Sequence, residues 1–201
     1  AILDLSNQTG ISSSEIAGNV YDAISAGQKT GDAVNFVSNS TKLARAGFAD
    51  AGSALDVLTT IMNAYGLEAA EVGRVSDVLI QTQNLGKTTV GEQSSSMGKI
   101  IPTAKANGVA LEQVAAGYAL MTANGVATAE STTYMNSMFN ELGKSGTKVS
   151  DTLKEKTGKS FLELMQTGQL SEVLQVISDS AAEQGLAFGD LWGSAEPGKL
   201  G

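Results

Sequence analysis

Residues 50–66 read DAGSALDVLTTIMNAYG and carry the signals of a single amphipathic helix. Asp50 is a residue type that accepts a hydrogen bond from a free amide of the first turn, which is the role of a helix N-cap. The apolar residues that follow fall at positions i, i+3, i+6, i+7 and i+10, which share one helix face: Leu55, Leu58, Ile61, Met62 and Tyr65. Gly66 comes directly after them, where a glycine commonly ends a helix. The stretch therefore predicts a helix between Asp50 and Gly66.

Similar apolar stripes occur along most of the chain. They comprise Ile16/Val20/Ile24, Val72/Val75/Leu79, Leu111/Val114/Ala115/Tyr118, Tyr134/Met138/Leu142 and Leu170/Val173/Leu174/Ile177. Sustained alternation of apolar and polar residues, which is typical of a half-buried strand, is absent. We therefore expect an all-α fold, a compact array of about 8–10 short helices joined by glycine turns.

Glycines recur at the ends of these stripes. The predicted structural turns are Gly27, Gly47, Gly66, Gly86, Gly108, Gly125 and Gly143. Their spacing leaves room for a helix of ~14–17 residues and a short turn. Three turns share the pattern Ala-x-Gly-apolar, at residues 64–67, 106–109 and 123–126, and Gly47 is followed by Phe48. The pattern predicts a left-handed glycine, with the apolar residue folded back onto the last helical turn.

Other local signals mark helix starts and one interruption. Ser12 with Glu15, and Thr89 with Glu92, fit the capping box, in which the hydroxyl and the carboxylate satisfy two free amides. Pro102 lies inside a further apolar stripe and lacks an amide donor, so we expect it to kink or restart that helix.

The composition excludes several kinds of chemistry. The chain has 201 residues, which suits one domain or two small ones, and its 42% hydrophobic content is too high for a disordered chain. It contains no Cys and no His, so the commonest metal ligands and the commonest general base are missing. No apolar run approaches the ~18 residues of a membrane-spanning helix. We expect no catalysis, no metal, no cofactor and no membrane segment in this chain.

Charge is unevenly distributed. The net charge is −8, made up of −6 over residues 1–143, +3 over residues 144–159 and −5 over residues 160–201. This acidity disfavours a direct grip on nucleic acid. We expect a main helical domain at residues 1–143, a basic connecting segment at 144–159 and a C-terminal helical segment at 160–201. The basic segment is either a solvated connection with a short helix beginning near Ser150, or an anion-docking patch.

Two motifs resemble motifs of enzymes, one a phosphate-binding loop and the other a catalytic pair of carboxylates. The string GSAEPGK at residues 193–199 fits seven positions of a phosphate-binding loop, but Leu200 stands where that loop needs Ser or Thr. Glu68 and Glu71 are spaced as a carboxylate pair, but they lie in one first turn, where the helix dipole favours acids in any case. Neither motif predicts a catalytic site.

A third motif set resembles that of penicillin-recognising enzymes. Residues 96–99 read Ser-Met-Gly-Lys, and residues 29–31 and 156–158 read Lys-Thr-Gly. In those enzymes Lys-Thr-Gly lies on a strand, whereas both strings here stand beside predicted helix starts. Helix-end chemistry therefore explains them better.

Near the C-terminus, three apolar residues cluster in a glycine-rich segment. They are Phe188, Leu191 and Trp192. Such a cluster either anchors a core or contacts a partner, and we name the three as possible interaction residues.

Four stretches stand in an order that is seen elsewhere. They are LARAG at 43–47 running into DAGSAL at 50–55, AYGL at 64–67 followed by VSD at 75–77, TAKANGVALE at 103–112, and the segment from Gly168 to DLWGSAE at 190–196. In this order the chain resembles the conserved core of the tail tape measure proteins of long-tailed bacteriophages and prophages. The resemblance covers most of the chain, from about residue 36 onward.

The resemblance implies a virion structural protein that takes part in tail assembly and sets tail length. Its implied partners are tail tube, tail chaperone and baseplate proteins, together with further copies of itself. Its implied locations are the lumen of the tail tube and, during assembly, the host cytoplasm. Because the chain opens with Ala1-Ile2-Leu3 and no Met, we expect it to be a piece of a longer protein. The open alternative is an acidic helical protein-binding module or a secretion-system substrate.

Overall fold

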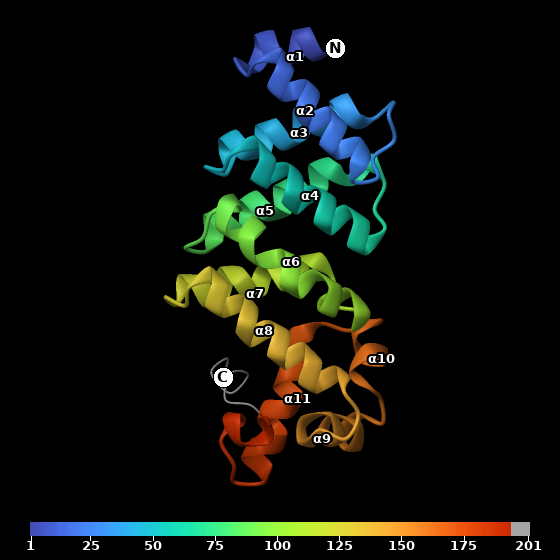
Figure 1. Ribbon diagram of the computed structural model, residues 1–201. Helices are drawn as coiled ribbons and strands as arrows, with labels where there is room; N and C mark the ends of the chain where they lie inside the picture. Colours follow the sequence, from blue (N-terminus) through green and yellow to red (C-terminus); the bar gives the residue numbers. More distant parts are fainter. Residues whose placement is uncertain (194–201) are drawn as a thin grey trace. The chain divides into compact units, whose positions relative to one another are not determined.

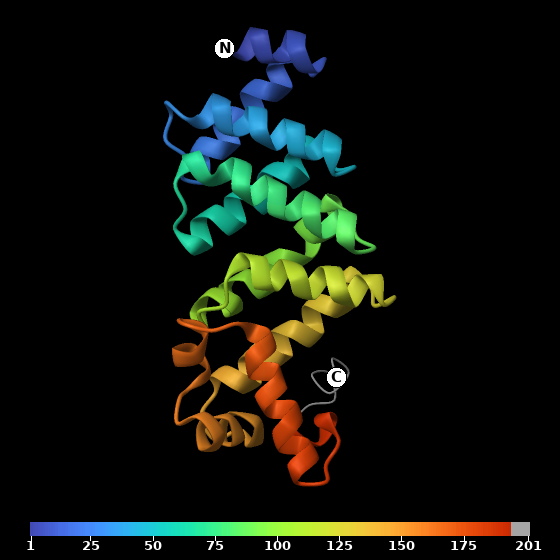
Figure 2. The same cartoon turned by 180° about the vertical axis from the view of Figure 1, so that it is seen from behind.

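The computed structural model describes residues 1–193, and the chain divides into two compact units, the first at residues 1–98 and the second from Lys99 onward. Figures 1 and 2 show the ribbon from opposite sides. The described residues form eleven α-helices and two 3-10 helices, and no strand occurs among them. The predicted all-α fold is thus confirmed. Within residues 1–193, no helix is both long and apolar enough to cross a membrane.

The first unit consists of helices that reverse direction at each turn (Figure 1). They are α1 (Ile2–Thr9), α2 (Ser13–Ser25), α3 (Ala33–Ala46), α4 (Ala51–Tyr65), the 3-10 helix η1 (Ala69–Glu71) and α5 (Val72–Leu85). Helix α3 is central, because it contacts α1, α2, α4 and α5. Phe36 of α3, Leu58 of α4 and Leu79 of α5 are among its fully buried side chains. Burial of each contributes ~1.5–3 kcal/mol to the free energy of unfolding.

Helix α6 (Val90–Ala106) begins in the first unit and ends in the second. It contains Pro102, which we expected to kink or restart the helix, but the helix does not restart there. A proline removes one amide donor from the helical ladder. Ile100, Ile101 and Ala104 around it are fully buried, and this burial favours the continuous helix over a break.

The second unit contains the remaining helices. They are α7 (Leu111–Ala123), α8 (Thr128–Gly143), α9 (Lys148–Thr157), α10 (Phe161–Met165), α11 (Leu170–Glu183) and the 3-10 helix η2 (Phe188–Leu191). Phe139 of α8 stacks on Phe161 of α10, with ring centroids 6.3 Å apart. Tyr118 of α7 is fully buried, and its hydroxyl is 2.5 Å from the hydroxyl of Thr132 on α8. These contacts place the core of the unit around α8.

The turn after α4 has the geometry that its sequence predicts. Gly66 has a φ of 66°, and its amide donates to the carbonyl of Asn63 at 3.3 Å. The amide of Leu67 donates to the carbonyl of Met62 at 2.8 Å. This pair of bonds defines a Schellman turn, in which a left-handed residue lets the chain cap the last carbonyls of its own helix.

The other predicted turn glycines fall into two groups. Gly27, Gly108 and Gly125 also have positive φ. By contrast, Gly47 has a φ of −94°, Gly86 has a φ of −105°, and Gly143 is the last residue of α8. At the turn after α3 the left-handed residue is Phe48, with a φ of 51°. Further left-handed glycines that sequence reasoning did not single out are Gly10, Gly146, Gly158 and Gly185.

The predicted cap at Asp50 and the predicted capping box at Thr89 are confirmed, whereas the box predicted for Ser12 and Glu15 is confirmed in its hydroxyl half. The amide of Glu15 donates to the hydroxyl of Ser12 at 3.2 Å, and the amide of Ser53 donates to the carboxylate of Asp50 at 2.8 Å. At the start of α6 the amide of Glu92 donates to the hydroxyl of Thr89. The amide of Thr89 in turn donates to the Glu92 carboxylate at 2.9 Å, which completes the capping box.

Candidate interaction surface

The predicted C-terminal cluster lies on and directly after η2. Leu191 is fully buried and Trp192 is 7% exposed, whereas Phe188 keeps part of its ring in solvent. The rings of Phe188 and Trp192 are tilted by 52°, with centroids 5.5 Å apart, which is a favourable aromatic arrangement. Leu191 and Trp192 therefore belong to the core of the second unit, and Phe188 presents the accessible face of the cluster.

Polar contacts fix this cluster to α8 and α9. The ammonium of Lys148 on α9 donates to the carbonyl of Asp190 at 2.9 Å. The Asp190 carboxylate accepts a hydrogen bond from the amide of Ala187 at the start of η2. Glu141 of α8 accepts one from the amide of Gly193 at 2.6 Å. Phe188 therefore sits on a support that is bonded to two other helices.

The basic segment, residues 144–159, contains α9, and two of its lysines are engaged within the unit. Lys148 holds the Asp190 carbonyl, as described above. Lys156 forms an ion pair with Glu183 of α11 at 2.5 Å. The hydrogen bond to Glu183, and then its charge, raise the pKa of Lys156 above its ordinary value. Both lysines thus tie α9 to the segment that ends in η2.

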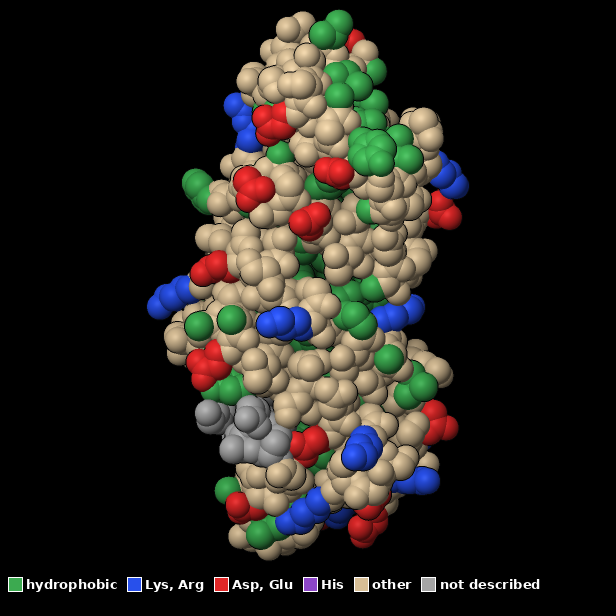
Figure 3. All heavy atoms as spheres, viewed as in Figure 1, with side chains coloured by type: hydrophobic (Ala, Val, Ile, Leu, Met, Phe, Trp, Pro, Cys, Tyr) green, Lys and Arg blue, Asp and Glu red, His purple; other side chains and the backbone are tan. Residues whose placement is uncertain are grey.

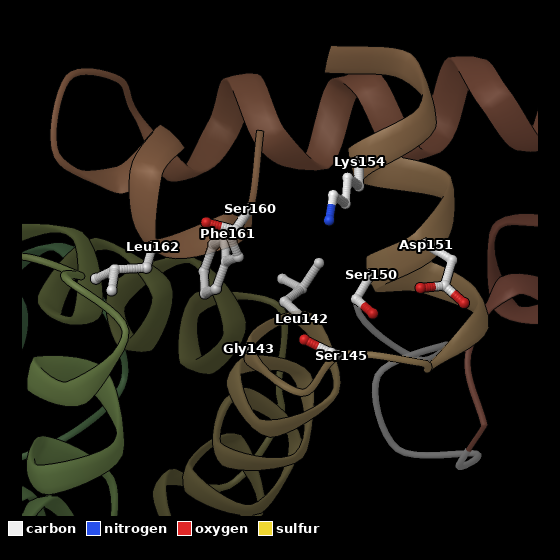
Figure 4. Close-up of a pocket in the computed structure, with 9 residues that line it drawn as sticks. All are labelled: Leu142, Gly143, Ser145, Ser150, Asp151, Lys154, Ser160, Phe161 and Leu162. Carbon is white, nitrogen blue, oxygen red and sulfur yellow. The ribbon is translucent and has the colours of Figure 1, made fainter. Parts of the chain in front are cut away.

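A cavity of about 260 Å³ opens beside α9. It is lined by Leu142, Gly143, Ser145, Ser150, Asp151, Lys154, Ser160, Phe161 and Leu162 (Figure 4). Figure 4 shows the Lys154 ammonium reaching toward the space between α9 and the start of α10. The hydroxyl of Ser160 already donates to Glu163 at 2.6 Å, and that of Ser150 donates to a backbone carbonyl. Asp151 also opposes an anion here, so we assign no ligand to this cavity.

The enzyme-like strings lie in helices or at helix ends. Ser96 is buried inside α6. At residues 156–158, Thr157 donates to the carbonyl of Leu153 at 2.7 Å, and Gly158 ends α9 with a φ of 73°. The copy at residues 29–31 lies in the turn between α2 and α3. Of the phosphate-loop string, Gly193 is described, and residues 194–199 lie outside the described part.

The acidic residues Glu68 and Glu71 form ion pairs and a hydrogen bond at the start of α5. Glu68 pairs with Lys29 at 3.5 Å, and Glu71 pairs with Arg74 at 3.1 Å. The Glu71 carboxylate also accepts a hydrogen bond from the amide of Glu68 at 3.3 Å. Exposed pairs of this kind contribute ~0–1 kcal/mol. In the described range no group of three or more Asp, Glu, His or Cys residues is placed to hold a metal ion.

Sequence reasoning missed a set of strongly exposed apolar side chains. The most exposed are Leu3 (69%), Tyr21 (72%), Phe48 (85%), Leu85 (64%) and Leu120 (67%), followed by Leu162 and Ile24. The sequence of α2 contains a pattern that could have predicted part of this set. Ala17, Val20, Tyr21 and Ile24 stand at i, i+3, i+4 and i+7, which defines an apolar stripe beside the buried residue Ile16.

Long-range hydrogen bonds hold the turn that carries Phe48. Gln83 of α5 donates from its side-chain amide to the carbonyl of Ala46 at 3.4 Å. Its side-chain oxygen accepts from the amide of Val90 at 3.0 Å. The Val90 amide is also 3.3 Å from the carbonyl of Gly47. The α3–α4 turn and the α5–α6 turn are therefore bonded into one edge of the first unit.

Comparison with known proteins identifies relatives over almost the whole chain. The family described as phage-related minor tail proteins matches residues 1–193. The probable tape measure protein of Clostridium phage phiCD119 is 42% identical over 98% of the chain, and the tape measure protein of Pneumococcus phage Dp-1 is 24% identical over 79%. The aligned regions make up 22% and 14% of those two proteins. No solved structure matches the chain significantly.

These matches confirm the resemblance that the ordered stretches of the sequence predict. The relationship extends over the residues of both compact units, from α1 to η2. The chain therefore belongs to the family of phage-related minor tail proteins.

Proposed function

We propose that this chain is a structural region of a phage tail tape measure protein, with a role in tail assembly and tail length determination. The observation that carries the proposal is the 42% identity to the probable tape measure protein of Clostridium phage phiCD119 along 98% of the chain. The region acts through contacts with other proteins and performs no catalytic step.

The helix lengths favour docking over measuring. A continuous helix of 201 residues would span ~300 Å at 1.5 Å per residue. The longest helix among the described residues, α6, has 17 residues and spans ~26 Å. Within each unit the chain turns back after every helix, so the distance that the unit spans is much shorter than the summed length of its helices. We infer that this region contributes to length determination by anchoring a longer protein to other tail components.

The proposed partners are tail tube, tail chaperone and baseplate proteins, with several copies of the chain in each particle. The proposed locations are the lumen of the tail tube and, before that, the host cytoplasm. Phe188 is the proposed contact residue of the C-terminal segment, because it is only half-buried and its ring packs on that of Trp192. The division into a main domain, a basic connection at residues 144–159 and a C-terminal segment remains part of this proposal.

An in-frame deletion of the codons for this region from its phage tests the docking role. We expect particles that lack complete tails, because an anchoring contact is lost. Electron microscopy distinguishes the outcomes. Intact tails shortened by ~300 Å would show that the region is a ruler and contradict docking. Tails of normal length would contradict any role in assembly.

A point variant tests the contact residue without removing the fold. Phe188→Ser is expected to reduce co-purification of tail tube, chaperone or baseplate proteins with the chain from infected cells. The control is Leu162→Ser, which removes an exposed apolar side chain elsewhere in the same unit. Circular dichroism establishes that both variants keep their helices. Equal recovery of tail proteins with both variants would contradict the role of Phe188.

A further inference from the structure

The second unit contains the same five-residue string at two successive helix turns. Residues 106–110, at the α6–α7 turn, and residues 123–127, at the α7–α8 turn, both read Ala-Asn-Gly-Val-Ala. Each string holds an Asn-Gly pair, and the sequence has no third one. An asparagine before glycine is especially prone to lose its side-chain amide, because glycine has no side chain that hinders attack by its backbone nitrogen. The two turns therefore have the same intrinsic reactivity, and only their surroundings can make them differ.

The hydrogen bonds within the two turns are alike. The side-chain amides of Asn107 and Asn124 each donate to the carbonyl four residues back, at 2.9 and 2.8 Å. The backbone amides of Gly108 and Gly125 each donate to the carbonyl three residues back, at 3.1 and 3.0 Å. Both glycines have a positive φ. Local interactions thus protect the two asparagines to a similar extent.

The α6–α7 turn is covered by other parts of the second unit. Asn107 is half-buried, and a β-carbon added at Gly143, the last residue of α8, would be 2.8 Å from the Cγ atom of Asn107. A β-carbon added at Gly108 would be 3.1 Å from the Cδ1 atom of Leu162 and 3.5 Å from the Cβ atom of Met165, both on α10. Opening this turn therefore requires that it separate from α8 and from α10.

Among the described residues, nothing packs on the α7–α8 turn in this way. Asn124 and Gly125 are exposed, and a β-carbon added at Gly125 would meet nothing within 4 Å. Figure 1 shows this turn at the edge of the ribbon, and Figure 3 shows the same edge at the molecular surface in the space-filling view. Opening this turn breaks only its own hydrogen bonds, and such small local openings are the most frequent ones in a folded protein.

We propose that Asn124 is a site of spontaneous deamidation in the folded chain, whereas Asn107, in the same five-residue string, is protected by packing. The backbone nitrogen of Gly125 forms a bond to the Cγ atom of Asn124, and the side-chain nitrogen leaves as ammonia with the amide proton of Gly125. Water then opens the resulting succinimide. Cleavage of the new bond between nitrogen and Cγ gives aspartate, and cleavage of the bond to the backbone carbonyl carbon gives isoaspartate. The proposal is independent of the tail assignment.

The product changes the end of α7. The new carboxylate lies at the C-terminus of the helix, where the helix dipole disfavours a negative charge. It replaces the amide that donates to the carbonyl of Leu120, so that hydrogen bond is lost. Isoaspartate also lengthens the main chain of the turn by one carbon atom. Deamidation is therefore expected to weaken the connection between α7 and α8.

Mass spectrometry of the purified 201-residue chain during incubation at mildly alkaline pH tests the proposal. Proteolysis after glutamate separates the two sites, because residues 93–112 contain Asn107 and residues 113–130 contain Asn124. Each rate is measured in the folded chain and in concentrated guanidinium chloride, and the ratio of the unfolded to the folded rate gives the protection of that asparagine. Protection of Asn107 is expected to exceed that of Asn124 at least about fivefold.

Two results of this measurement would overturn the proposal. One is a smaller difference in protection between the two asparagines, or a difference in the opposite direction. The other is an Asn124 that stays intact in the folded chain although it reacts in the unfolded chain.

A variant in α10 tests whether packing decides the difference. Leu162→Ala removes the side chain that lies over Gly108, so it is expected to raise the Asn107 rate several-fold and to leave the Asn124 rate unchanged. The matched control is Leu85→Ala, which shortens an exposed leucine of the first unit and should change neither rate. Circular dichroism establishes that both variants keep their helices. If Asn107 is as well protected in Leu162→Ala as in the wild type, the proposal is wrong.

A second variant identifies the reacting side chain. Asn124→Gln keeps a side-chain amide but places it one carbon further from the backbone nitrogen that attacks it. It is expected to abolish the mass gain of residues 113–130 in the folded chain. A mass gain that persists at the wild-type rate would show that another group reacts and would contradict the assignment.

Discussion

Gly47 lies directly against Val90, so closely that a β-carbon added at Gly47 would be 2.5 Å from the Cβ of Val90. The two residues are far apart in sequence, yet their backbones also meet in a hydrogen bond of 3.3 Å. Because Gly47 has an ordinary φ of −94°, its importance comes from this close approach and not from a left-handed conformation.

Gly47→Ala is therefore expected to lower the free energy of unfolding by ~1–3 kcal/mol, the cost of forcing a methyl group into a packed contact. Urea unfolding of the purified chain measures this change. The control is Gly18→Ala in α2, where an added β-carbon meets nothing within 4 Å. That variant should gain ~0.5–1 kcal/mol from helix propensity. Equal effects of the two substitutions would refute the close-packing account.

Gln83→Ala is expected to destabilise the first unit by ~1–2 kcal/mol, because it removes two hydrogen bonds between turns. Gln83→Glu keeps the oxygen near the Val90 amide and loses the donor to Ala46, so its effect should be smaller. The exposed neighbour Asn84 provides a control, since Asn84→Ala should have little effect. Chemical denaturation of the three variants provides the comparison. Similar values for Gln83→Ala and Asn84→Ala would show that the bridge contributes nothing.

Phe48→Gly is expected to raise the free energy of unfolding by up to about 1 kcal/mol, because glycine adopts the left-handed conformation without strain. Gly66→Ala is the opposite experiment, since Gly66 has a φ of 66° and space around its α-carbon. It should lose about 1 kcal/mol through backbone strain alone. Thermal and urea unfolding measure both changes. A loss of stability in Phe48→Gly would show that the ring packs usefully within its own chain.

Asp50 makes stability depend on pH. Its hydrogen bonds with Ser53 lower the pKa of the Asp50 carboxyl below its ordinary value of 3.8. The unfolded chain then binds this proton more readily, so the contribution of the carboxylate is present above pH 3.8 and is lost as pH falls through the lower folded-state pKa. Asp50→Asn keeps a capping oxygen without the charge. The stability advantage of the wild type over Asp50→Asn should therefore shrink between about pH 6 and about pH 3. An advantage that is constant over this range would contradict the assignment.

Tyr118 should ionise at a higher pH than an ordinary tyrosine, whose pKa is 10.0. Burial raises the pKa of Tyr118 to about 12, although the hydrogen bond with Thr132 acts in the opposite direction. Because the folded-state pKa is the higher one, the contribution to stability is complete below pH 10 and is lost as pH rises toward about 12. An ultraviolet titration of tyrosinate should show a late step that Tyr118→Phe abolishes. A wild-type titration identical in shape to that of Tyr118→Phe would contradict this assignment.

The helices and many of their ends follow from the sequence, because the interactions that form them are local. The cap from Asp50 to Ser53 joins residues three apart, and the Schellman turn at Gly66 closes with partners three and five residues away. The membership in a tail protein family is also readable from ordered stretches of sequence. The helices and their ends depend on chemistry within one or two helical turns, so a periodic pattern in the sequence is enough to predict them.

Tertiary structure alone decided how those helices combine. Gly47 was expected to be left-handed, but the contact with Val90 gives it a packing role and leaves the positive φ to Phe48. Gln83 reads as an ordinary polar helix residue until its two bonds to separate turns are seen. Tyr21 and Phe48 are apolar and remain exposed because no described segment of their own unit covers them. Contacts between residues dozens of positions apart leave no periodic trace in sequence, so the side chains that stay exposed are decided only when the helices pack.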